Sequence, residues 1–565
     1  MVSVAEEISK TIKQSSIAEF FEKNRHLLGF DSKLKALITC IKEAVDNSLD
    51  ACEEMVNAHK RKKLDYSLPE IIVSVRDNGN EHFVIKVIDN GPGIVKNQLP
   101  NVFTRLLYGS KFHQLKQGRG QQGIGISAAV LYAQLSTGKA THVVSKIGPD
   151  QPAYFYDLRI NTINNKPEIV GEGVLERFQY EHGTEVELEI EGTYQTTGEK
   201  SVYEYLRRTS IVNPHVKIIF YTPDGKKVDF PRITEEMPKE SISIKPHPYG
   251  IEIGTFIKMA AITSSYTVKS FMMNDFSRMG ATTVDAILKE AGIEGRYKPS
   301  ELSRDQCEKI VKIIQKTKIM NPPTDCLSPI GDEALRKSLR TGLDTEFVTT
   351  ISRPPSVYRG NPFLIEAAIA YGGSLPSEGS VDVIRFANKV PLQYSGGACA
   401  ITEMVKSIDW RRYGLNQSGG AGIPSGQAVI LVHMASVWIP FTSESKAAIA
   451  HYDEIMKEMK LALQDCGREL GKYLNKKQKA LRQQQRISTF IKYADESIQS
   501  LFELTGEKKE VIKELFEKVI NERIGSLKDE EEDETGEEQK VDNMDDVDKF
   551  IIKEEGMNNE RNEEE

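Results

Sequence analysis

A glycine-rich run placed directly ahead of an apolar helix limits most strongly how this chain can fold. Glycines stand at positions 118, 120, 123 and 125, and a mostly apolar helix is predicted from Ala128 to Leu135. Such a run presents several unshielded backbone N–H groups at a helix N-terminus, where the helix dipole also favours negative charge. It is neither a Walker A loop nor a G-x-G-x-x-G turn after a first strand. The run predicts a phosphate-binding loop, with a flexible linker as the alternative.

A second segment places two polar groups on one face of a predicted helix that spans about 33 to 57. Glu43 and Asn47 are four residues apart, which puts the carboxylate and the amide side by side. A carboxylate can orient and deprotonate a water molecule, and an amide oxygen can hold Mg²⁺ whose other ligands are phosphate oxygens and waters. The pair is suited to metal-assisted hydrolysis. A solvated polar stripe on a helix is the simpler interpretation of this spacing alone.

A third segment is a strand that ends in an acid and is followed by two glycines. Asp89 closes the predicted strand, and Gly91 and Gly93 let the backbone pass close to a flat ligand. The carboxylate of Asp89 can accept a hydrogen bond from an exocyclic amine such as that of adenine. A plain turn with the sequence D-N-G-P-G is the alternative.

Length and charge set the wider frame. A chain of 565 residues is too long for one core, so several domains are expected. Residues 529–565 hold 18 acidic and 4 basic side chains, which leaves the rest of the chain at about +6 from a total of −8. The body permits a polyanionic partner, and the acidic tail is expected to be disordered. No membrane span or secretory signal is apparent, and six scattered cysteines form no C-x-x-C pair, so a cytoplasmic protein is expected.

Strands and helices alternate in two blocks. The β-branched or alternating segments 71–75, 83–88, 142–146, 154–160, 184–190 and 216–221 predict strands of a first α/β unit. Helical patterns follow, with Thr283 as an expected N-cap, Gly292 as a stop, and Ser303 with Gln306 as a capping box. A second α/β unit is predicted from strands at 381–387 and 429–439 and a helix from about 444. That helix continues into the basic stretch 472–492, and a further amphipathic piece spans 496–526.

In this order and spacing the three motifs resemble the Bergerat nucleotide fold of the GHKL ATPases, which include gyrase and the histidine kinases. His182, Gly183 and Thr184 open a strand and match the fold's fourth element, in which a threonine supports the adenine end. The resemblance implies that ATP and Mg²⁺ are the cofactors. The implied nucleotide-binding residues are those of the four motifs: Asn47, Asp89, Gly91, Gly93, Ser110, Lys111, Arg119, Gly120, Gln121, Gln122, Gly123, Ile124, Gly125, Ile126 and Thr184.

The amino-acid sequences of residues 41–51 and 120–131 are closely similar to those of the B subunits of DNA topoisomerase VI, a type IIB topoisomerase. This resemblance implies an ATPase domain at 1–241 with an N-terminal strap at 1–20, a helix-two-turn-helix domain at 242–321, and a transducer domain at 322–488 ending in a long helix. A C-terminal helical segment at 489–528 and the acidic tail at 529–565 would follow.

Within the predicted transducer, Lys446 stands near an expected helix start, where a cation is disfavoured unless an anion lies between. The family supplies such an anion, because a switch lysine from this loop reaches the γ-phosphate of ATP. The resemblance therefore implies Glu43 as general base, Asn47 as metal ligand and Lys446 as a catalytic and phosphate-sensing cation. Asn388 and Gln393 also look family-like, but strand-end hydrogen bonding is their simpler interpretation.

The resemblance further implies partners. Two B subunits would close on ATP binding, and a topoisomerase VI A subunit would cut DNA within an A₂B₂ enzyme, because no D-x-D stands on a predicted strand and no tyrosine stands out as a nucleophile. Lysines and arginines of 472–492 would contact double-stranded DNA through its phosphates, with a solvated helix face as the alternative. A histidine kinase is a poor match, since His26 lacks a long helix around it. A non-catalytic ATP-gated clamp or another GHKL ATPase stays open.

Overall fold

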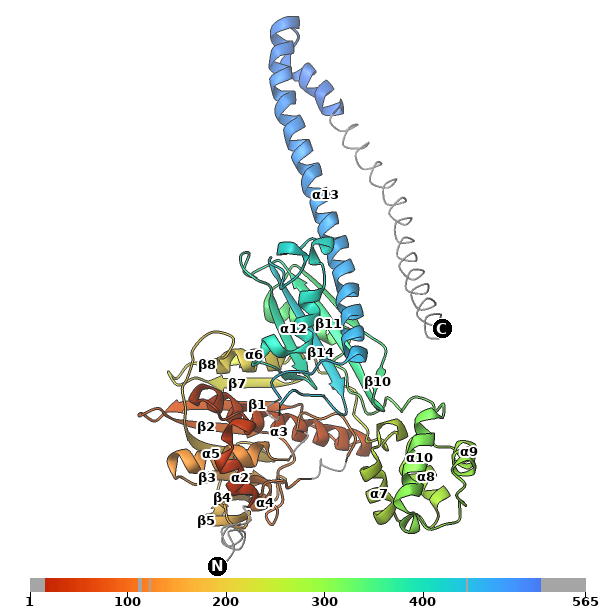
Figure 1. The fold of residues 1–565 in the computed structure, drawn as a ribbon. Coiled ribbons are helices and arrows are strands. Elements are labelled where there is room, and N and C mark those ends of the chain that lie inside the picture. The colour runs from red at the N-terminus through yellow and green to blue at the C-terminus, as the bar shows by residue number, and fades with distance from the viewer. Residues whose placement is uncertain (1–15, 110–113, 121–122, 444–445, 520–565) are drawn as a thin grey trace, which may run out of the picture. The chain divides into compact units, whose positions relative to one another are not determined.

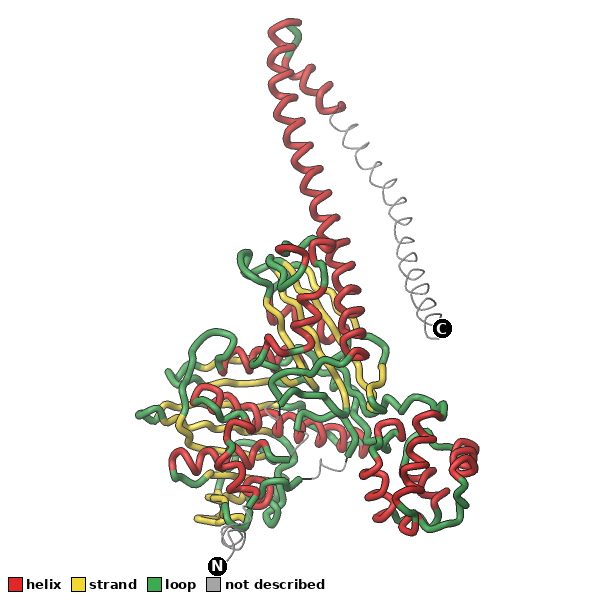
Figure 2. Tube along the Cα trace, in the orientation of Figure 1, coloured by secondary structure: helices red, strands yellow, loops and turns green. Residues whose placement is uncertain are grey.

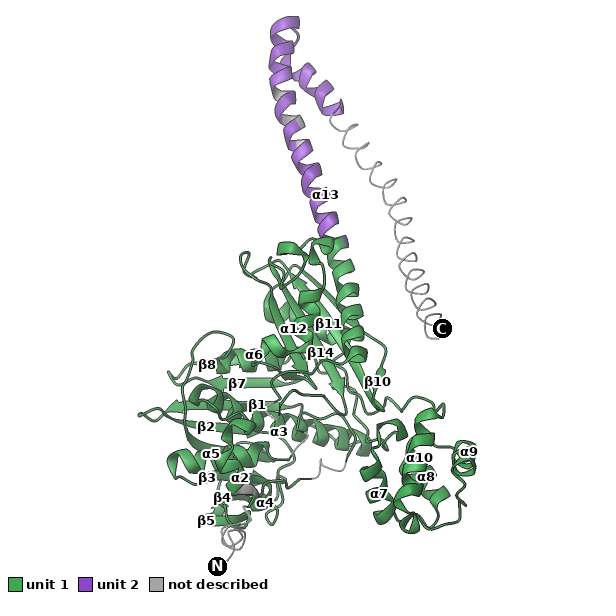
Figure 3. Cartoon of the chain, in the orientation of Figure 1, with its two compact units in different colours: residues 1–471 green, residues 472–565 purple. Residues whose placement is uncertain are grey.

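The computed structural model describes residues 16–109, 114–120, 123–443 and 446–519. The chain divides into two compact units, residues 1–471 and residues 472–565 (Figure 3). The first unit contains two β-sheets and a group of helices between them in sequence (Figure 1). No helix in the described ranges is both long enough and apolar enough to cross a membrane.

The first sheet has eight strands in the order β5-β4-β3-β6-β2-β1-β7-β8. Neighbouring strands are antiparallel, except that β1 and β7 run parallel. The strands are β1 (Glu70–Asp77), β2 (His82–Asp89), β3 (Thr141–Lys146), β4 (Ala153–Asn161), β5 (Lys166–Leu175), β6 (Gly183–Glu191), β7 (Lys217–Tyr221) and β8 (Lys227–Phe230).

Helices cover one face of this sheet. Alternation along β1 directs Ile71 and Val73 into a core shared with the helices, whereas Ile72 joins a small apolar cluster on the opposite face. The helices of this part are α2 (Ile17–Lys23), α3 (Lys33–Lys62), α4 (Leu99–Thr104), α5 (Gly125–Thr137) and α6 (Val202–Val212). The motif-bearing helices α3 and α5 pack on each other above the sheet.

The six strands predicted for this unit are confirmed, and β5 and β8 are additional. In β5 no residue is buried, and the strand contains a proline and two glycines, so it lacks the apolar alternation that identifies a strand from sequence.

A separate helical group follows, built from α7 (Ile253–Ile262), α8 (Val268–Asp275), α9 (Ala281–Ala291) and α10 (Arg304–Lys316) around its own apolar core. Figure 2 shows this group as helices joined by loops. The capping box is confirmed, because Gln306 N donates to Ser303 Oγ and Ser303 N donates to Gln306 Oε1. The stop at Gly292, with φ of 69°, is also confirmed. The prediction of Thr283 as N-cap is wrong: the N-cap of α9 is Gly280, three residues earlier, and the helix begins at Ala281.

The second sheet has the order β10-β11-β14-β12-β13, and β9 also pairs with β11. Its elements are β9 (Phe347–Ser352), β10 (Ser356–Tyr358), β11 (Asn361–Tyr371), β12 (Asp382–Ala387), β13 (Val390–Pro391) and β14 (Ala428–Ser436), with α11 (Asp332–Leu343) and α12 (Ala400–Ser407) beside them. Every residue of β14 is buried, as expected for a strand covered on both faces.

The helix predicted from about 444 begins later. Residues 446–452 are irregular, Phe441 and Ile449 form an isolated bridge, and α13 (Asp453–Thr505) starts at Asp453. Lys446 is therefore not at a helix start, and it has a φ of 51°. The part of α13 up to residue 471 buries an apolar stripe at helical spacing, formed by Ile455, Met459, Leu463, Cys466 and Leu470. The compact unit that begins at residue 472 contains the rest of α13 and a helix over 509–519.

Short 3-10 helices complete the described structure: η1 (Arg25–Leu28), η3 (Pro248–Gly250), η4 (Pro299–Glu301), η5 (Gly396–Ala398), η6 (Trp410–Tyr413) and η7 (Ser418–Gly420). The predicted succession of an α/β unit, a helical insert and a second α/β unit is confirmed.

Candidate functional site

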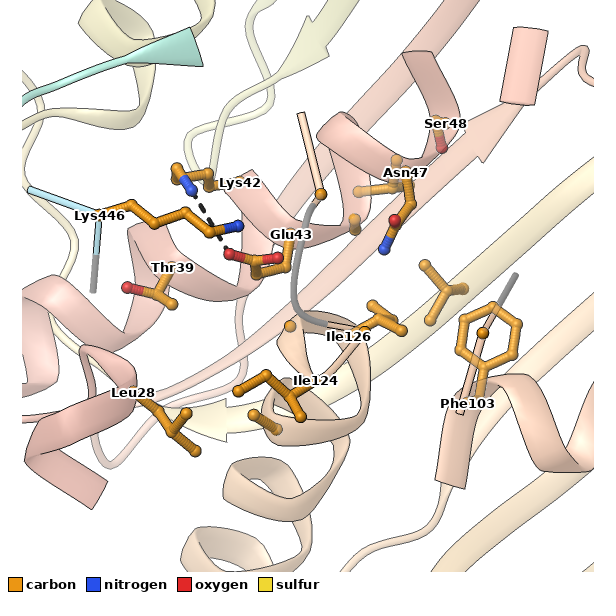
Figure 4. A pocket seen from close by; sticks show the side chains of 18 of the residues that line it. Leu28, Thr39, Lys42, Glu43, Asn47, Ser48, Phe103, Ile124, Ile126 and Lys446 are labelled. Atoms are coloured by element: carbon orange, nitrogen blue, oxygen red, sulfur yellow. Dashed lines mark hydrogen bonds and ion pairs between the residues drawn. The ribbon is translucent and has the colours of Figure 1, made fainter. Parts of the chain in front are cut away.

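A cavity of about 320 Å³ lies where α3, the start of α5 and the end of β2 meet (Figure 4). Segments of the second α/β unit also line it, namely residues 391–394 and Lys446 with Ala447. The cavity thus joins residues that are some 400 positions apart in the chain. Most of the residues that the sequence singles out lie around it.

One end of the cavity is organised by Asp89, the last residue of β2. Ser48 of α3 donates a hydrogen bond of 2.7 Å from Oγ to Asp89 Oδ2. The backbone N–H groups of Gly91 and Thr184 donate to Asp89 Oδ1 at 2.9 and 3.2 Å. Burial raises the pKa of Asp89 to about 6, even though these three hydrogen bonds act in the opposite direction. The carboxylate is fixed in place and partly desolvated, as a specific acceptor for a ligand amine should be.

The glycines beside Asp89 allow the backbone to come close. Gly93 has a φ of 69°, and a β-carbon there would overlap the carbonyl of Lys146. Gly93, Thr184 and Val186 line the cavity, while Gly91 turns its N–H to Asp89 and does not line it. Apolar residues, including Phe103 and Ile94, also line the cavity.

Glu43 and Asn47 project from one face of α3 into the middle of the cavity, as predicted (Figure 4). Lys42 lies beside them, with Nζ 3.4 Å from Glu43 Oε1 and 3.6 Å from Asp46 Oδ2. Burial lowers the pKa of Lys42, but the two carboxylates together raise it above its ordinary value. Burial also raises the pKa of Asp46 to about 6. A cation therefore lies beside the carboxylate that the sequence predicts as general base.

The glycine-rich run enters α5 directly beneath Glu43. Gly120, Gly123, Gly125 and Ile126 line the cavity, and Ile124 is the N-cap of α5. A β-carbon at Gly125 would overlap the Glu43 carboxylate, so any other residue at position 125 would displace this side chain from its present place. The first turn of α5 therefore faces the polar part of the cavity, the arrangement that favours a bound phosphate.

Lys446 reaches the same part of the cavity from the second α/β unit. Figure 4 shows its side chain extending toward Glu43. Its Nζ donates to the carbonyl oxygen of Arg119 at 3.5 Å. Burial lowers the pKa of Lys446, and the charge of Glu43 acts against this effect. A desolvated cation held near the start of α5 is a strong potential partner for an anion.

Arg119 contributes backbone rather than side chain to this region. Its guanidinium is buried away from the cavity and pairs with Asp50 at 2.8 Å and Glu53 at 2.6 Å. It also donates to Asn213 Oδ1. The predicted residues Ser110, Lys111, Gln121 and Gln122 lie outside the described residues.

Sequence reasoning missed several lining residues. Lys42 directly precedes Glu43 on α3, and Ser48 directly follows Asn47. Both could have been predicted to line the site from their position next to that motif. The lining segment 391–394 had no such signal, because only the fold brings it to α3. Gln393, predicted to make strand-end hydrogen bonds, donates to Glu199 O at 2.8 Å and also lines the cavity.

Comparison with known proteins identifies both halves of this arrangement. Residues 32–191 match the family model of the histidine kinase-, DNA gyrase B- and HSP90-like ATPases, and residues 322–486 match that of the topoisomerase VI B subunit transducer. The B subunit of type 2 DNA topoisomerase 6 from Methanococcoides burtonii is 50% identical over 473 residues, which cover 84% of this chain and 74% of that protein. The chain belongs to the topoisomerase VI B subunit family.

The B subunit of this family from Pyrococcus furiosus is 37% identical over 567 residues, covering 92% of this chain and 96% of that protein. A solved B subunit of DNA gyrase from Myxococcus xanthus is a distant match, at 10% identity and a TM-score of 0.38 over 80% of this chain and 95% of that chain. Membership of the topoisomerase VI B family confirms the GHKL ATPase fold for the first α/β unit and the transducer for the second.

Proposed function

We propose that this chain binds ATP with Mg²⁺ and hydrolyses it as the B subunit of a type IIB DNA topoisomerase. The observation that carries the proposal is the convergence of Glu43, Asn47 and Lys446 in one cavity whose far end is organised by Asp89. Adenine would bind at Asp89 and Thr184, and the phosphates would lie along the glycine-rich run. The cavity volume of about 320 Å³ is within the range of small-molecule sites, about 300–1,000 Å³.

In this proposal Glu43 takes the proton of the attacking water, and Lys42 and Lys446 control its charge. Lys42 Nζ lies 3.4 Å from Glu43 Oε1, and the side chain of Lys446 extends toward the same carboxylate (Figure 4). Lys446 would also offset the negative charge that develops on the transferred phosphoryl group. The second α/β unit would thereby sense whether a γ-phosphate is present.

Asn47 would be the protein's ligand for Mg²⁺. Its amide lines the cavity next to Glu43, at a point where phosphate oxygens of a bound nucleotide would arrive. Mg²⁺ usually keeps several waters and binds through few protein groups plus phosphate oxygens, so one amide is a sufficient protein contribution. The metal supplies charge neutralisation at the phosphates when it is bound.

ATP binding would favour a closed dimer of two B subunits, and hydrolysis would let it reopen. Double-strand cleavage would belong to a topoisomerase VI A subunit in an A₂B₂ enzyme, which would relax and decatenate DNA. Lysines and arginines of 472–492 would contact the duplex through phosphates. The enzyme would act in the cytoplasm.

The proposed domains are an ATPase domain at 1–241 with a strap at 1–20, a helix-two-turn-helix domain at 242–321 and a transducer at 322–488. A helical segment at 489–528 and an acidic tail at 529–565 would follow. The separate apolar core of α7 to α10 supports the second of these domains.

The test is to assay ATP hydrolysis and supercoil relaxation with and without a purified A subunit. The proposal expects relaxation only from the mixture, and only with hydrolysable ATP. ATP-dependent retention of DNA rings by the B subunit, with no relaxation from the mixture, would instead favour an ATP-gated clamp. Failure to bind ATP at all would refute both functions.

A further inference from the structure

We propose that Asn388 is a positioning residue that fastens the start of the glycine-rich loop to the strand leading to Lys446. This inference rests on the proposed ATPase function, and it assigns a role to a residue that the sequence leaves without chemistry. The role is to keep Lys446 and the phosphate-binding loop in register, so that both engage one nucleotide.

Asn388 occupies the first position of the two-residue turn between β12 and β13. It has a φ of 49° and Lys389 has a φ of 64°, a combination typical of a type I′ hairpin turn, in which asparagine is favoured. The side chain is 5% exposed. The turn explains why asparagine is tolerated there, but it does not require the amide to reach across to the ATPase unit.

The amide of Asn388 makes three hydrogen bonds. Nδ2 donates to the carbonyl oxygens of Gly118 at 3.1 Å and Ser436 at 2.9 Å, and Oδ1 accepts from Ser436 N at 2.9 Å. Gly118 opens the glycine-rich run, and Ser436 is the last residue of β14, ten positions before Lys446. One side chain therefore joins the proposed phosphate-binding loop to the end of β14, the strand that precedes the segment with the proposed switch lysine.

Lys446 itself completes the connection. Its Nζ donates to the carbonyl oxygen of Arg119, the residue after Gly118. Two successive carbonyl groups of the loop thus accept hydrogen bonds from two side chains of the second α/β unit. Loss of the Asn388 contact would let the end of β14, and the segment with Lys446 that follows it, shift relative to the loop, and misplacement by about 1 Å is enough to slow a positioned reaction substantially.

The same point of the loop is anchored on its other side. The guanidinium of Arg119 pairs with Asp50 and Glu53 of α3, and Asn213, its third partner, donates from Nδ2 to the carbonyl oxygen of Lys389 at 3.3 Å. The Asn388 turn is therefore connected to α3 by a second route. Residues 118–119 are therefore held against α3 through Arg119, and Asn388 connects them to Ser436 at the end of β14.

Two substitutions test the hydrogen bonds of the Asn388 side chain separately from the backbone conformation of the turn. Asn388→Gly keeps the positive φ without strain and removes all three hydrogen bonds. Asn388→Asp keeps the acceptor for Ser436 N but removes both donors. Asn80→Gly is the matched control, because Asn80 is an exposed asparagine at φ of 53° in the turn between β1 and β2.

The assembled enzyme, with its A subunit, is assayed for ATP-analogue affinity, ATP hydrolysis and melting temperature. We expect both Asn388 variants to bind the analogue within about threefold of the original and to hydrolyse ATP roughly 10- to 100-fold more slowly. The Asn80 variant should match the original enzyme. Original enzyme that does not hydrolyse ATP would refute the proposed function, whereas active original enzyme with unaltered Asn388 variants would refute only this inference.

A double-variant cycle with Lys446→Met distinguishes positioning from a general structural role. If Asn388 acts through Lys446, the double variant should hydrolyse ATP no more slowly than Lys446→Met alone. Two independent losses that multiply would overturn the inference. Should Asn388→Gly fail to fold, by loss of its cooperative melting transition, Asn388→Asp decides the cycle in its place.

Discussion

The α-carbon of Gly125 lies against the carboxylate of Glu43, so a β-carbon at position 125 would overlap that side chain. Gly125→Ala should therefore displace Glu43 while leaving the apolar core intact. We expect ATP hydrolysis to fall at least 100-fold, with a small change in melting temperature. Gly254→Ala is the control, because Gly254 lies in helix α7 and nothing within 4 Å would meet its β-carbon. Equal activity of the two variants would contradict the placement of Glu43.

Replacing Glu43 tests its role as a base directly. Glu43→Gln keeps the size of the side chain and removes the proton acceptor, so hydrolysis should fall by about 10² to 10⁴ while nucleotide still binds. Turnover is measured by phosphate release and binding by titration with a labelled nucleotide. Glu308→Gln serves as the control, since Glu308 is exposed on α10 and pairs with Lys312. Undiminished phosphate release would remove Glu43 from the proposed reaction.

The proposed contact of Lys446 with a γ-phosphate predicts that replacing this lysine reduces discrimination between ATP and ADP. Lys446→Met should weaken binding of a non-hydrolysable ATP analogue by roughly tenfold or more, because a desolvated ion pair is lost, and should leave ADP affinity nearly unchanged. Lys460→Met, at an exposed position of α13, is the control. An equal loss for both nucleotides would place the ammonium group elsewhere.

The substitution Asp89→Asn is expected to weaken ATP binding and, at neutral pH, to stabilise the folded protein. Burial raises the pKa of the Asp89 carboxyl to about 6 from an ordinary value of 3.8, so the folded protein binds this proton more tightly than the unfolded chain does. The ionised carboxylate therefore destabilises the fold, and stability relative to Asp89→Asn should fall as the pH rises from 4 to 7, by up to about 3 kcal/mol. Unfolding of both proteins at several pH values measures this difference.

The same Asp89→Asn variant should bind ATP at least tenfold more weakly at pH 7.5, because a charged acceptor contributes about 1.5–3 kcal/mol to a hydrogen bond. Tighter or unaltered ATP binding, or a stability difference that does not depend on pH, would show that Asp89 is not the buried adenine acceptor.

Local patterns predicted most of the fold. Strands such as β1 and β6 were visible because their apolar alternation matches one covered face, and the capping box of α10 is encoded within four residues. The segment after β14 was mispredicted as helix because its composition is helix-compatible. There the chain instead bends through Lys446 and pairs Phe441 with Ile449 before α13 begins.

The candidate site was predictable only where one element carries it. Glu43 and Asn47 share a helical face, and Asp89 ends a strand, so each could be identified from spacing. The pairing of Arg119 with Asp50 and Glu53, and the hydrogen bond from Asn388 to Gly118, join residues between 66 and 270 positions apart. No periodicity encodes such contacts, because they arise from packing of one element on another.

The participation of residues 391–394 and Lys446 in the cavity wall has a practical consequence for ligand discovery. A fragment trimmed to the first sheet and its helices would retain the proposed purine subsite at Asp89 but would lack the part of the cavity wall that residues 391–394, Lys446 and Ala447 form. Compounds selected on such a fragment would be optimised for the purine end alone. Compounds that extend to Tyr394 and Ala447 would be found only by screening the longer chain.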